Sequence, residues 1–477
     1  MDTVIATTRA SSSGKVLILG GYLIVEAPNV GISVGTTARF ETRLLSLLDA
    51  AKGKCCVRIL SPQFGKEFVF ECTVESTPEP AVSVTQTEGP HSPFLRYSVL
   101  YTVAAAISHG GNVFRELTLE LLADNDFYSQ RNYLESQGKE VTAANLRLLP
   151  PHLPLVGDVS KTGLGSSAAM TTSMVACLYR LLTTQNNSDN CEKHTTAKTD
   201  TSAEKELVHR VAQVAHSVAQ GKIGSGFDVY TAAYGTCAYR RFPAQFVESV
   251  MSTNESPSNV VVSTLADCVK LEKEWVKRVP FHLPLGLKLM LGDVHQGGSG
   301  TPGMVSKVMA WRKSVADNPN NLWEQLRENN EKYVASLKAL ILQADEKTVE
   351  HVNSVDVLKH VVIAQHIPQN DAERLWVEAA TYASKSRRYL REMGQAASVE
   401  IEPNKLTALL DATCAIPGVF AVGCPGAGGY DAVFALVLGD ETCTSVESFW
   451  EEYTAMRVCP LLVREDAAGL IFSSGEK

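Results

Sequence analysis

One short stretch of this chain, Lys161-Thr-Gly-Leu-Gly-Ser-Ser-Ala-Ala169, restricts the local fold more than any other. Gly163 and Gly165 permit positive φ angles and a close approach of the backbone to a ligand, and two serines follow where a helix can begin. Apolar residues then recur at helical spacing, at Met170, Met174, Leu178 and Leu181. The pattern predicts a glycine-serine loop that opens a buried helix, whose free N–H groups and dipole favour a phosphate. An ordinary serine-capped turn fits the same residues.

Other glycine-rich turns are spread along the chain. A short apolar run, Val16 to Leu19, follows Gly14-Lys15 and leads into Gly20-Gly-Tyr22, and further clusters lie at residues 221–228, 296–303 and 423–431. Several such turns beside strand or helix ends indicate loops that converge on a phosphorylated ligand. Lys15 at the mouth of a buried strand agrees with such a site, although a solvated strand end would carry a lysine equally well.

The common nucleotide-binding signatures do not fit these turns. None of the five Gly-Lys pairs has the upstream glycine and the downstream Ser or Thr of a P-loop. The His-Arg-Asp and Asp-Phe-Gly signatures of protein kinases are missing. Gly163-x-Gly165-x-x-Ala168 matches the loose dinucleotide fingerprint, but no strand-like run comes directly before it, which counts against a Rossmann unit.

Charge and cysteine usage limit the class of protein. The formal net charge of −8 argues against a nucleic-acid partner, which would require a basic surface. The eleven cysteines are scattered, and Cys177, Cys237 and Cys424 lie in apolar or small-residue runs, as is typical of reduced, buried thiols. No basic leader and no run of membrane-spanning length is present, so we expect an intracellular, cytoplasmic protein without a membrane partner, with import into an organelle left open.

The patterns of apolar residues predict two α+β domains, separated by a variable loop between residues 243 and 286. We expect loops at residues 75–91 and 124–153, a polar, variable insertion at residues 183–203, and a mainly helical region from Thr301 to Met393. Further strands are predicted at residues 39–47, 55–60, 67–74, 116–122, 236–242, 287–291, 418–422 and 432–438, and further helices at residues 93–107, 204–220 and 404–414.

Three of the glycine-rich motifs, in this order, resemble those of the GHMP small-molecule kinases: Ser-Gly-Lys-Val-Leu-Ile-Leu-Gly-Gly-Tyr22, the Lys161 to Ala169 stretch and Cys-Pro-Gly-Ala-Gly-Gly-Tyr-Asp431. Ala212-Gln-Val-Ala-His216 with Ala219-Gln-Gly-Lys-Ile-Gly-Ser-Gly-Phe-Asp228 is similar, more narrowly, to the eukaryotic phosphomevalonate kinases. The resemblance implies an α+β fold of two domains with the active site in the cleft between them. It places a ribosomal-S5-like, ATP-binding domain at residues 1–285 and a second α+β domain at residues 286–477.

The resemblance also implies roles for individual residues. Lys15 and Asp228 would be catalytic, Lys15 beside the transferred phosphoryl group and Asp228 near the acceptor. The ATP phosphates would be bound by Lys161, Gly163, Leu164, Gly165, Ser166, Ser167 and Ala168. A hydroxyl of Ser166 or Ser167 would help to hold Mg²⁺. The substrate side would be lined by Tyr22, Lys222, Ser225, Ser299, Thr301, Gly426, Gly428 and Gly429. Arg131 is a further candidate contact, and Ser13 departs from the proline that many members carry.

The implied reaction transfers the γ-phosphoryl group of ATP to phosphomevalonate, with Mg²⁺, in a monomer or weak homodimer. Because a phosphate monoester is largely ionised at neutral pH, such an acceptor needs little help from a base, and Asp228 can orient Lys15 and the substrate instead. Three other functions remain open: a related kinase for mevalonate or a sugar, an inactive metabolite sensor of this fold, and a dinucleotide oxidoreductase. Retention of both Lys15 and Asp228 disfavours the sensor.

Overall fold

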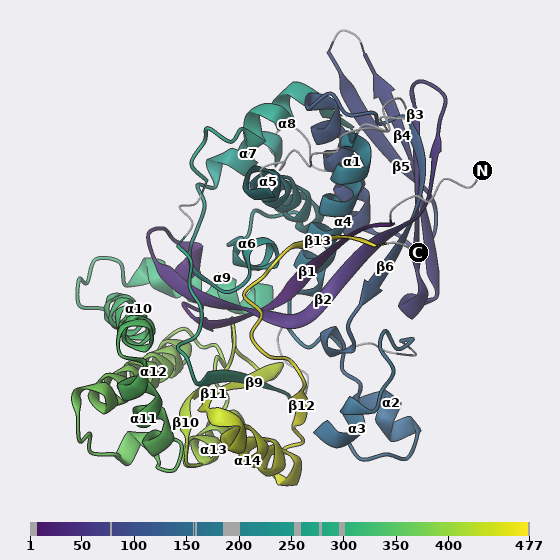
Figure 1. Ribbon diagram of the computed structural model, residues 1–477. Helices are drawn as coiled ribbons and strands as arrows, with labels where there is room; N and C mark the ends of the chain where they lie inside the picture. Colours follow the sequence, from purple (N-terminus) through teal and green to yellow (C-terminus); the bar gives the residue numbers. More distant parts are fainter. Residues whose placement is uncertain are drawn as a thin grey trace.

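A nine-stranded sheet dominates the N-terminal half of the molecule (Figure 1). The computed structural model describes residues 7–76, 79–155, 157, 160–184, 201–251, 259–275, 279–294 and 301–475, with the backbone alone at 201, 301–302 and 474–475. Eight strands follow the order β13-β1-β2-β6-β3-β4-β5-β8, and β7 pairs with β2. Among these described strands β3 and β6 pair in parallel, and the other pairs are antiparallel. The strands are β1 (Thr7–Leu19), β2 (Val30–Asp49), β3 (Lys54–Ser61), β4 (Lys66–Glu75), β5 (Ala81–Glu88), β6 (Arg115–Ala123), β7 (Cys237–Arg240), β8 (Asn259–Val261) and β13 (Ile471–Gly475).

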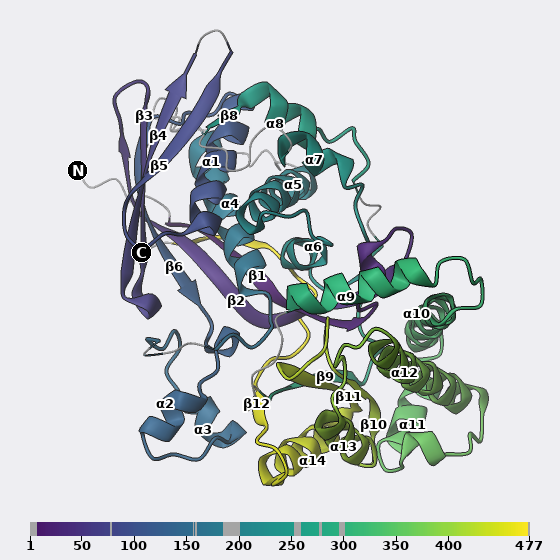
Figure 2. The same ribbon diagram turned by 180° about the vertical axis from the view of Figure 1, so that it is seen from behind.

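Helices cover one face of this sheet (Figures 1 and 2). Helix α4 packs on β1 and β2, while α1 and α5 pack against α4 and against each other. Because α1 and α4 lie between the sheet and other helices, both are apolar on nearly all sides, and each of them is almost wholly buried. The helices on this side are α1 (Pro93–Ser108), α4 (Ser166–Thr183), α5 (Thr201–Gln220), α6 (Phe227–Tyr234), α7 (Gln245–Met251) and α8 (Val262–Val269).

The C-terminal half has its own antiparallel sheet, in the order β10-β11-β9-β12. The central strands β9 and β11 are buried along almost their whole length, so their apolar runs are continuous rather than alternating. Helix α9 runs along the junction between the two halves (Figure 2). The elements are β9 (Leu287–Asp293), β10 (Val419–Gly423), β11 (Ala432–Leu438), β12 (Cys459–Leu461), α9 (Thr301–Ser314), α10 (Leu322–Glu346), α11 (Thr348–Leu358), α12 (Asp371–Ala396), α13 (Asn404–Cys414) and α14 (Gly439–Glu452).

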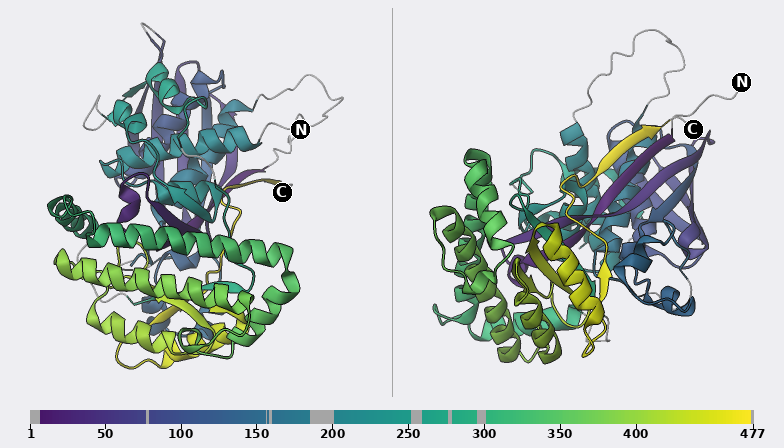
Figure 3. Two further views of the ribbon diagram at one scale, coloured as in Figure 1. Left: turned by 90° about the vertical axis from the view of Figure 1, so that its left-hand side faces the viewer. Right: turned by 60° about the horizontal axis from the view of Figure 1, so that its bottom comes forward.

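The chain returns to the N-terminal sheet at its end. Strand β13 pairs with β1, as the right-hand view of Figure 3 shows, where the yellow strand lies beside the purple one. Before it, Thr37 donates its backbone N–H to Arg464 O, and Arg39 forms an ion pair with Asp466. The last thirteen or so residues therefore pack on the first domain, while the proposed division at residues 285 and 286 stays a prediction.

Most predicted elements are confirmed, and three predicted loops are wrong. The interval 75–91 contains β5, which forms because β4 offers a free edge and Val82 and Val84 become buried against the core. The interval 124–153 contains α2 (Arg131–Ser136) and α3 (Ala143–Arg147), and residues 243–286 contain α7, β8 and α8. Contacts with distant parts of the chain decide the structure of these segments. The insertion at residues 183–203 lies mainly outside the described residues, but α4 and α5 include its two ends.

Single-turn 3₁₀ helices complete the fold at Leu23–Val25 (η1), Pro62–Phe64 (η2), Asn125–Phe127 (η3) and Ile363–Gln365 (η4). No helix in the described part of the chain combines the length and the apolar character that a membrane span requires. Cys177 and Cys237 are buried, as their apolar flanks predict, and burial raises the pKa of each thiol to about 12.

The buried imidazole of His209 on α5 should make the fold sensitive to acid. Its ring packs against Tyr230, Tyr234 and Trp275, and burial lowers its pKa from 6.5 to about 3. As the pH falls below 6.5, the unfolded chain binds a proton here that the folded chain does not, so the free energy of unfolding decreases until the pH approaches 3. Above pH 6.5 the effect is absent.

Denaturant unfolding of the wild type and of His209→Gln between about pH 6 and about pH 4 measures this effect. For each unit by which the pH falls, we expect the free energy of unfolding of the wild type to decrease by up to about 1.4 kcal/mol more than that of the variant. Parallel stability curves for the two proteins would contradict the prediction.

Candidate active site

The glycine-serine loop forms the entrance to α4, as its residues predict. Gly163 and Gly165 have φ angles of +77° and +75°, and α4 begins at Ser166 directly after them. The preceding residue, Thr162, anchors the loop, because its hydroxyl donates to Asp126 O at 2.5 Å. A helix of 18 residues thus has its N-terminal N–H groups beside a loop that only glycine can shape in this way.

Lys15 on β1 lies against this loop. Its Nζ donates a hydrogen bond of 2.7 Å to Gly163 O, and its backbone N–H donates to Leu164 O at 2.9 Å. A Cβ on Gly165 would come within 2.9 Å of the Lys15 side chain, so this position accepts no larger residue without movement of the lysine. The first and second motifs therefore meet, and one ammonium group lies beside the N-terminus of α4.

The charge of Lys15 is set by two opposing effects. Burial lowers the pKa of the ammonium group from its ordinary value, and the negative charges of Asp228 and then Asp431 raise it in part. Phe227 also lies under the ammonium group, with its ring centroid 5.3 Å from Nζ. The site therefore holds a partly desolvated cation in the electrostatic field of two carboxylates, one from each half of the chain.

The second glycine turn, Gly221 to Asp228, brings the carboxylate of Asp228 to the first turn of α6. Gly226 has a φ of +83°, and a Cβ there would lie 2.5 Å from the ring of Phe242. Arg241 holds the turn in place by donating to Gly224 O at 2.8 Å and to Val25 O. Hydrogen bonds from Arg241, directly after β7, therefore hold the turn in place. The carboxylate of Asp228 on α6 is close enough to Lys15 to raise its pKa.

His216 on α5 joins the glycine-serine loop to this carboxylate. Its Nε2 lies 3.1 Å from Ser167 Oγ and 3.9 Å from Asp228 Oδ2. The imidazole is 2% exposed, and burial lowers its pKa, an effect that the Asp228 carboxylate partly opposes. Three helices, α4, α5 and α6, therefore meet at one ring.

The third motif packs directly on the first. Gly426 donates its N–H to Leu17 O at 3.0 Å, and a Cβ on Gly21 would lie 2.4 Å from Gly426 O. Tyr22, itself at a φ of +69°, donates its hydroxyl to Ala427 O at 2.5 Å. The two loops fit together only because glycine leaves room for the opposite backbone.

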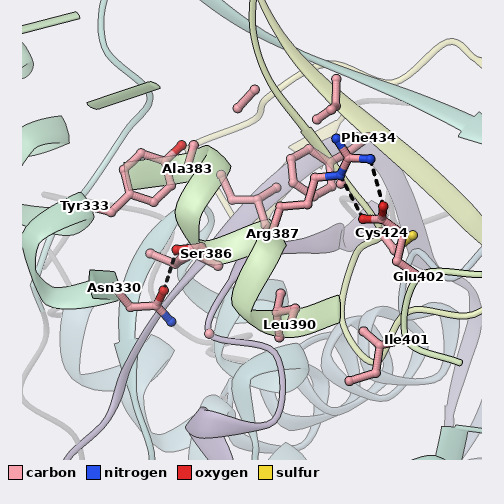
Figure 4. A pocket seen from close by; sticks show the side chains of 16 residues that line it. Asn330, Tyr333, Ala383, Ser386, Arg387, Leu390, Ile401, Glu402, Cys424 and Phe434 are labelled. Atoms are coloured by element: carbon pink, nitrogen blue, oxygen red, sulfur yellow. Dashed lines mark hydrogen bonds and ion pairs between the residues drawn. The ribbon is translucent and has the colours of Figure 1, made fainter. Parts of the chain in front are cut away.

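A half-buried ion pair between Arg387 and Glu402 lies next to the third motif. Figure 4 shows Arg387 on α12 facing Glu402, with two hydrogen bonds of 2.8 and 2.7 Å, beside a cavity of about 40 Å³. Ile401, next to Glu402, accepts a hydrogen bond of 2.9 Å from Gly429 N. The cavity is lined by residues of the first motif (Ile18 to Gly20) and of the third motif (Gly423 and Cys424).

Comparison with known proteins agrees with this geometry. A model of the GHMP kinases N terminal domain matches residues 152–236. The chain is 34% identical to a peroxisomal phosphomevalonate kinase of Arabidopsis thaliana, covering 98% of this chain and 96% of the relative, and 31% identical to the phosphomevalonate kinase erg8 of Aspergillus fumigatus, covering 94% and 91%. A solved structure of Streptococcus pneumoniae phosphomevalonate kinase in complex with phosphomevalonate and AMPPNP has the same fold, with a TM-score of 0.51 and 14% identity over 96% of this chain and 99% of that one.

The chain belongs to the phosphomevalonate kinase family of the GHMP kinases. Its α+β fold of two domains is the fold of that family, as the sequence motifs imply. The structure brings Lys15, the Gly163 to Ser167 loop and Asp228 together, although these residues are up to 213 positions apart in the chain (from 15 to 228).

Several residues that the family resemblance assigns to ligands already have partners within the protein. The N–H of Ala168 donates to Gly165 O, and the side chain of Leu164 is buried in the core. The N–H groups of the three predicted glycines of the third motif all donate to backbone carbonyls, at 2.9 to 3.2 Å. These glycines are Gly426, Gly428 and Gly429. They shape the loop, and any ligand contact from them would have to come from other atoms.

The remaining predicted residues differ in exposure, and two of them are described incompletely or not at all. Lys161 is exposed at a bridge with Tyr128, and Lys222 is exposed on the second glycine turn. Ser225 is half-buried, and its carbonyl accepts the hydroxyl of Tyr239 at 2.7 Å. Ser299 lies outside the described residues, and only the backbone of Thr301 is described, as the first residue of α9.

The segment from Asp124 to Arg131 lies beside the glycine-serine loop, near the site, as predicted. Within it, Asp126 O accepts the hydroxyl of Thr162. Ser129 donates its N–H to Ser160 O at 2.8 Å and its hydroxyl to Asp293 Oδ2 at 2.6 Å. Arg131 donates to Asp293 O at 3.3 Å, so its guanidinium contacts the end of β9. The segment therefore links the phosphate loop to the second domain.

Sequence reasoning assigned no role to His216, Asp431 or Asp293. His216 belongs to the Ala212 to His216 motif, four residues before Gln220 and twelve before Asp228. This spacing could have indicated that His216 lies near the second glycine turn. A helix places residues four apart on one face, so His216 had to face the second glycine turn if Gln220 does. Asp431 and Asp293 carried no local signal, because their relation to Lys15 and to Ser129 depends on the arrangement of the two domains.

Proposed function

We propose that this protein is a phosphomevalonate kinase, which transfers the γ-phosphoryl group of ATP to 5-phosphomevalonate and yields 5-diphosphomevalonate and ADP. The observation that carries the proposal is the position of Lys15, beside the Gly163 to Ser167 loop and in the electrostatic field of Asp228. The full-length similarity to phosphomevalonate kinases of a plant and a fungus supports the choice of acceptor.

The chemistry requires alignment and positive charge more than covalent participation. In phosphoryl transfer, negative charge spreads over the oxygens of the moving group, and a fixed cation stabilises it. Lys15 supplies such a cation, which donates to Gly163 O and is partly desolvated by its surroundings. The N-terminal N–H groups of α4 supply further positive charge to the phosphates of ATP.

Asp228 has a supporting role in this proposal. The acceptor phosphate is largely ionised at neutral pH, because its second pKa is about 6, and it can attack without losing a proton to a base. Asp228 raises the pKa of Lys15 against the effect of burial and so keeps the ammonium group charged. The carboxylate thereby maintains the cation that the transferred group requires.

The residues present fit a magnesium ion. Mg²⁺ prefers oxygen ligands and is usually held by one or two carboxylates, a hydroxyl and the substrate phosphates. Ser167 Oγ and Asp228 Oδ2 both lie near His216 Nε2, at 3.1 and 3.9 Å, so one hydroxyl and one carboxylate are close to the same ring nitrogen. Ser166 is buried beside Tyr128, which makes Ser167 the better candidate. When bound, the ion would neutralise phosphate charge.

Release of ADP from ATP and Mg²⁺ by the purified protein tests the proposal, with phosphomevalonate, mevalonate and galactose offered in parallel. Turnover with phosphomevalonate alone is the expected result. Turnover with mevalonate or galactose instead would assign the chain to a related kinase, and ATP binding without turnover of any acceptor would favour a metabolite sensor.

We further propose a cytoplasmic monomer or weak homodimer, acting without nucleic-acid or membrane partners. The net charge of −8 supports the absence of a nucleic-acid partner. A fluorescent fusion observed together with a peroxisomal marker tests the compartment, which matters because the plant relative is named peroxisomal. Light scattering across a concentration series tests the oligomeric state.

A further inference from the structure

The imidazole of His216 makes a chain of contacts that the proposed reaction does not by itself require. The amide nitrogen of Gln220 lies 2.5 Å from Nδ1 and 3.3 Å from Nε2 of the ring, and the ring Nε2 lies 3.1 Å from Ser167 Oγ. Phe94 on α1 packs on the ring, with centroids 5.3 Å apart. The ring is thus held from α1, α4 and α5 together.

The partners of the ring determine where its proton lies. When the amide nitrogen of Gln220 donates to Nδ1, the nearer of the two ring nitrogens, Nδ1 is an acceptor and carries no hydrogen. The proton of the neutral imidazole is then on Nε2, which donates to Ser167 Oγ. Because the lone pair of Ser167 receives this hydrogen bond, the hydroxyl proton of Ser167 must point away from the ring.

We propose that His216 is a positioning residue, which directs the hydroxyl of Ser167 toward the ATP phosphates and holds it beside Asp228. The proposal rests on the proposed function and deepens it. A serine hydroxyl otherwise rotates freely, and fixing it in advance removes a cost that binding and transfer would have to overcome. Gln220 acts through His216 by selecting the tautomer, as an outer partner orients a ligand in other sites.

A double-mutant cycle separates this role from simple packing. His216→Phe keeps a ring against Phe94 but removes both nitrogens, and we expect kcat to fall roughly 10-fold to 100-fold. Ser167→Ala should lower kcat by a similar or larger factor, and adding His216→Phe to Ser167→Ala should lower it no further. A packing role predicts instead that the two effects multiply, and that result overturns the proposal, as does a kcat of His216→Phe within about twofold of the wild type.

His209→Gln is the matched control. His209 lies on the same helix, two turns earlier, and is also buried, but its ring contacts are with Tyr230, Tyr234 and Trp275. We expect this variant to change stability and to leave kcat within about twofold of the wild type. A fall of kcat equal to that of His216→Phe would show that any buried histidine of α5 matters equally and would overturn the proposal.

The tautomer can be observed without turnover. In protein labelled with ¹⁵N-histidine, long-range ¹H–¹⁵N spectra should show His216 protonated at Nε2 and not at Nδ1, with the signal identified by its loss in His216→Phe. Gln220→Met removes the donor and should yield a mixture of tautomers, with a fall in kcat of roughly threefold to tenfold. A proton on Nδ1 in the wild type overturns the proposal even if phosphomevalonate is phosphorylated. An Nε2 proton without any turnover would leave the positioning geometry intact and reject the proposed reaction.

Discussion

Lys15→Ala should lower kcat by a factor of about 10² to 10³ and leave the Kd for ATP within about threefold of the wild-type value. The reason is that the ammonium group lies beside the phosphate loop but already has a ground-state partner in Gly163 O. Its contribution should therefore increase when charge moves to the oxygens of the transferred group. Steady-state kinetics with phosphomevalonate, together with binding of a non-hydrolysable ATP analogue, measure the two quantities.

Lys54→Ala provides the control for this experiment. Lys54 also follows a glycine, but it is exposed at the start of β3, where it pairs with Thr73 on β4. Its loss should change neither quantity. If Lys15→Ala weakened ATP binding by the same factor as kcat, Lys15 would act by ground-state binding, and its proposed role in the transition state would be wrong.

Asp228→Asn should lower kcat by roughly 10² and move the alkaline limit of activity to lower pH. Burial already lowers the pKa of Lys15, and the carboxylate of Asp228 is the larger of the two charges that oppose this effect. Removing that charge lowers the pKa of Lys15 further. The proposed role of Lys15 requires its charged form, so we expect activity present at low pH to be lost earlier as the pH rises. The pH dependence of kcat for the two proteins measures the shift.

A capping role for Asp228 is the alternative, because it lies in the first turn of α6. Asp440 lies in the first turn of α14 and forms an ion pair with Lys288, so Asp440→Asn removes a carboxylate from an equivalent position. If capping were the whole role, both variants would lose some stability and keep their turnover. Near-native turnover of Asp228→Asn would therefore show that Asp228 makes no catalytic contribution.

Local patterns were sufficient for the loops that surround the site. The positive φ angles of Gly163, Gly165 and Gly226 follow from the absence of a side chain, and the apolar spacing after Ser166 defines α4. Both are properties of a few consecutive residues, which explains why they could be predicted. Lys15, to which the family motifs assign a catalytic role, lies against the glycine-serine loop, and that role stays a prediction.

Local patterns failed where a partner far along the chain determines the structure. Strand β5 exists because β4 pairs with it, and α2 and α3 occupy a polar interval that had no helical period. The third-motif glycines carry the expected residue types, but their N–H groups donate to carbonyls such as Leu17 O and Ile401 O. Composition alone gave no information about these partners.

The amino-acid sequence by itself determined which residue types occur in the loops and which segments are helical, because both depend on short-range geometry. It also determined which family the chain resembles, because that depends on the order of the motifs. The sharing of His216 between Ser167 and Asp228, the placing of Asp431 near Lys15 and the return of β13 to β1 depend on the folded arrangement. Such contacts join residues up to several hundred positions apart, and their geometry is fixed only when the cores of both domains are packed.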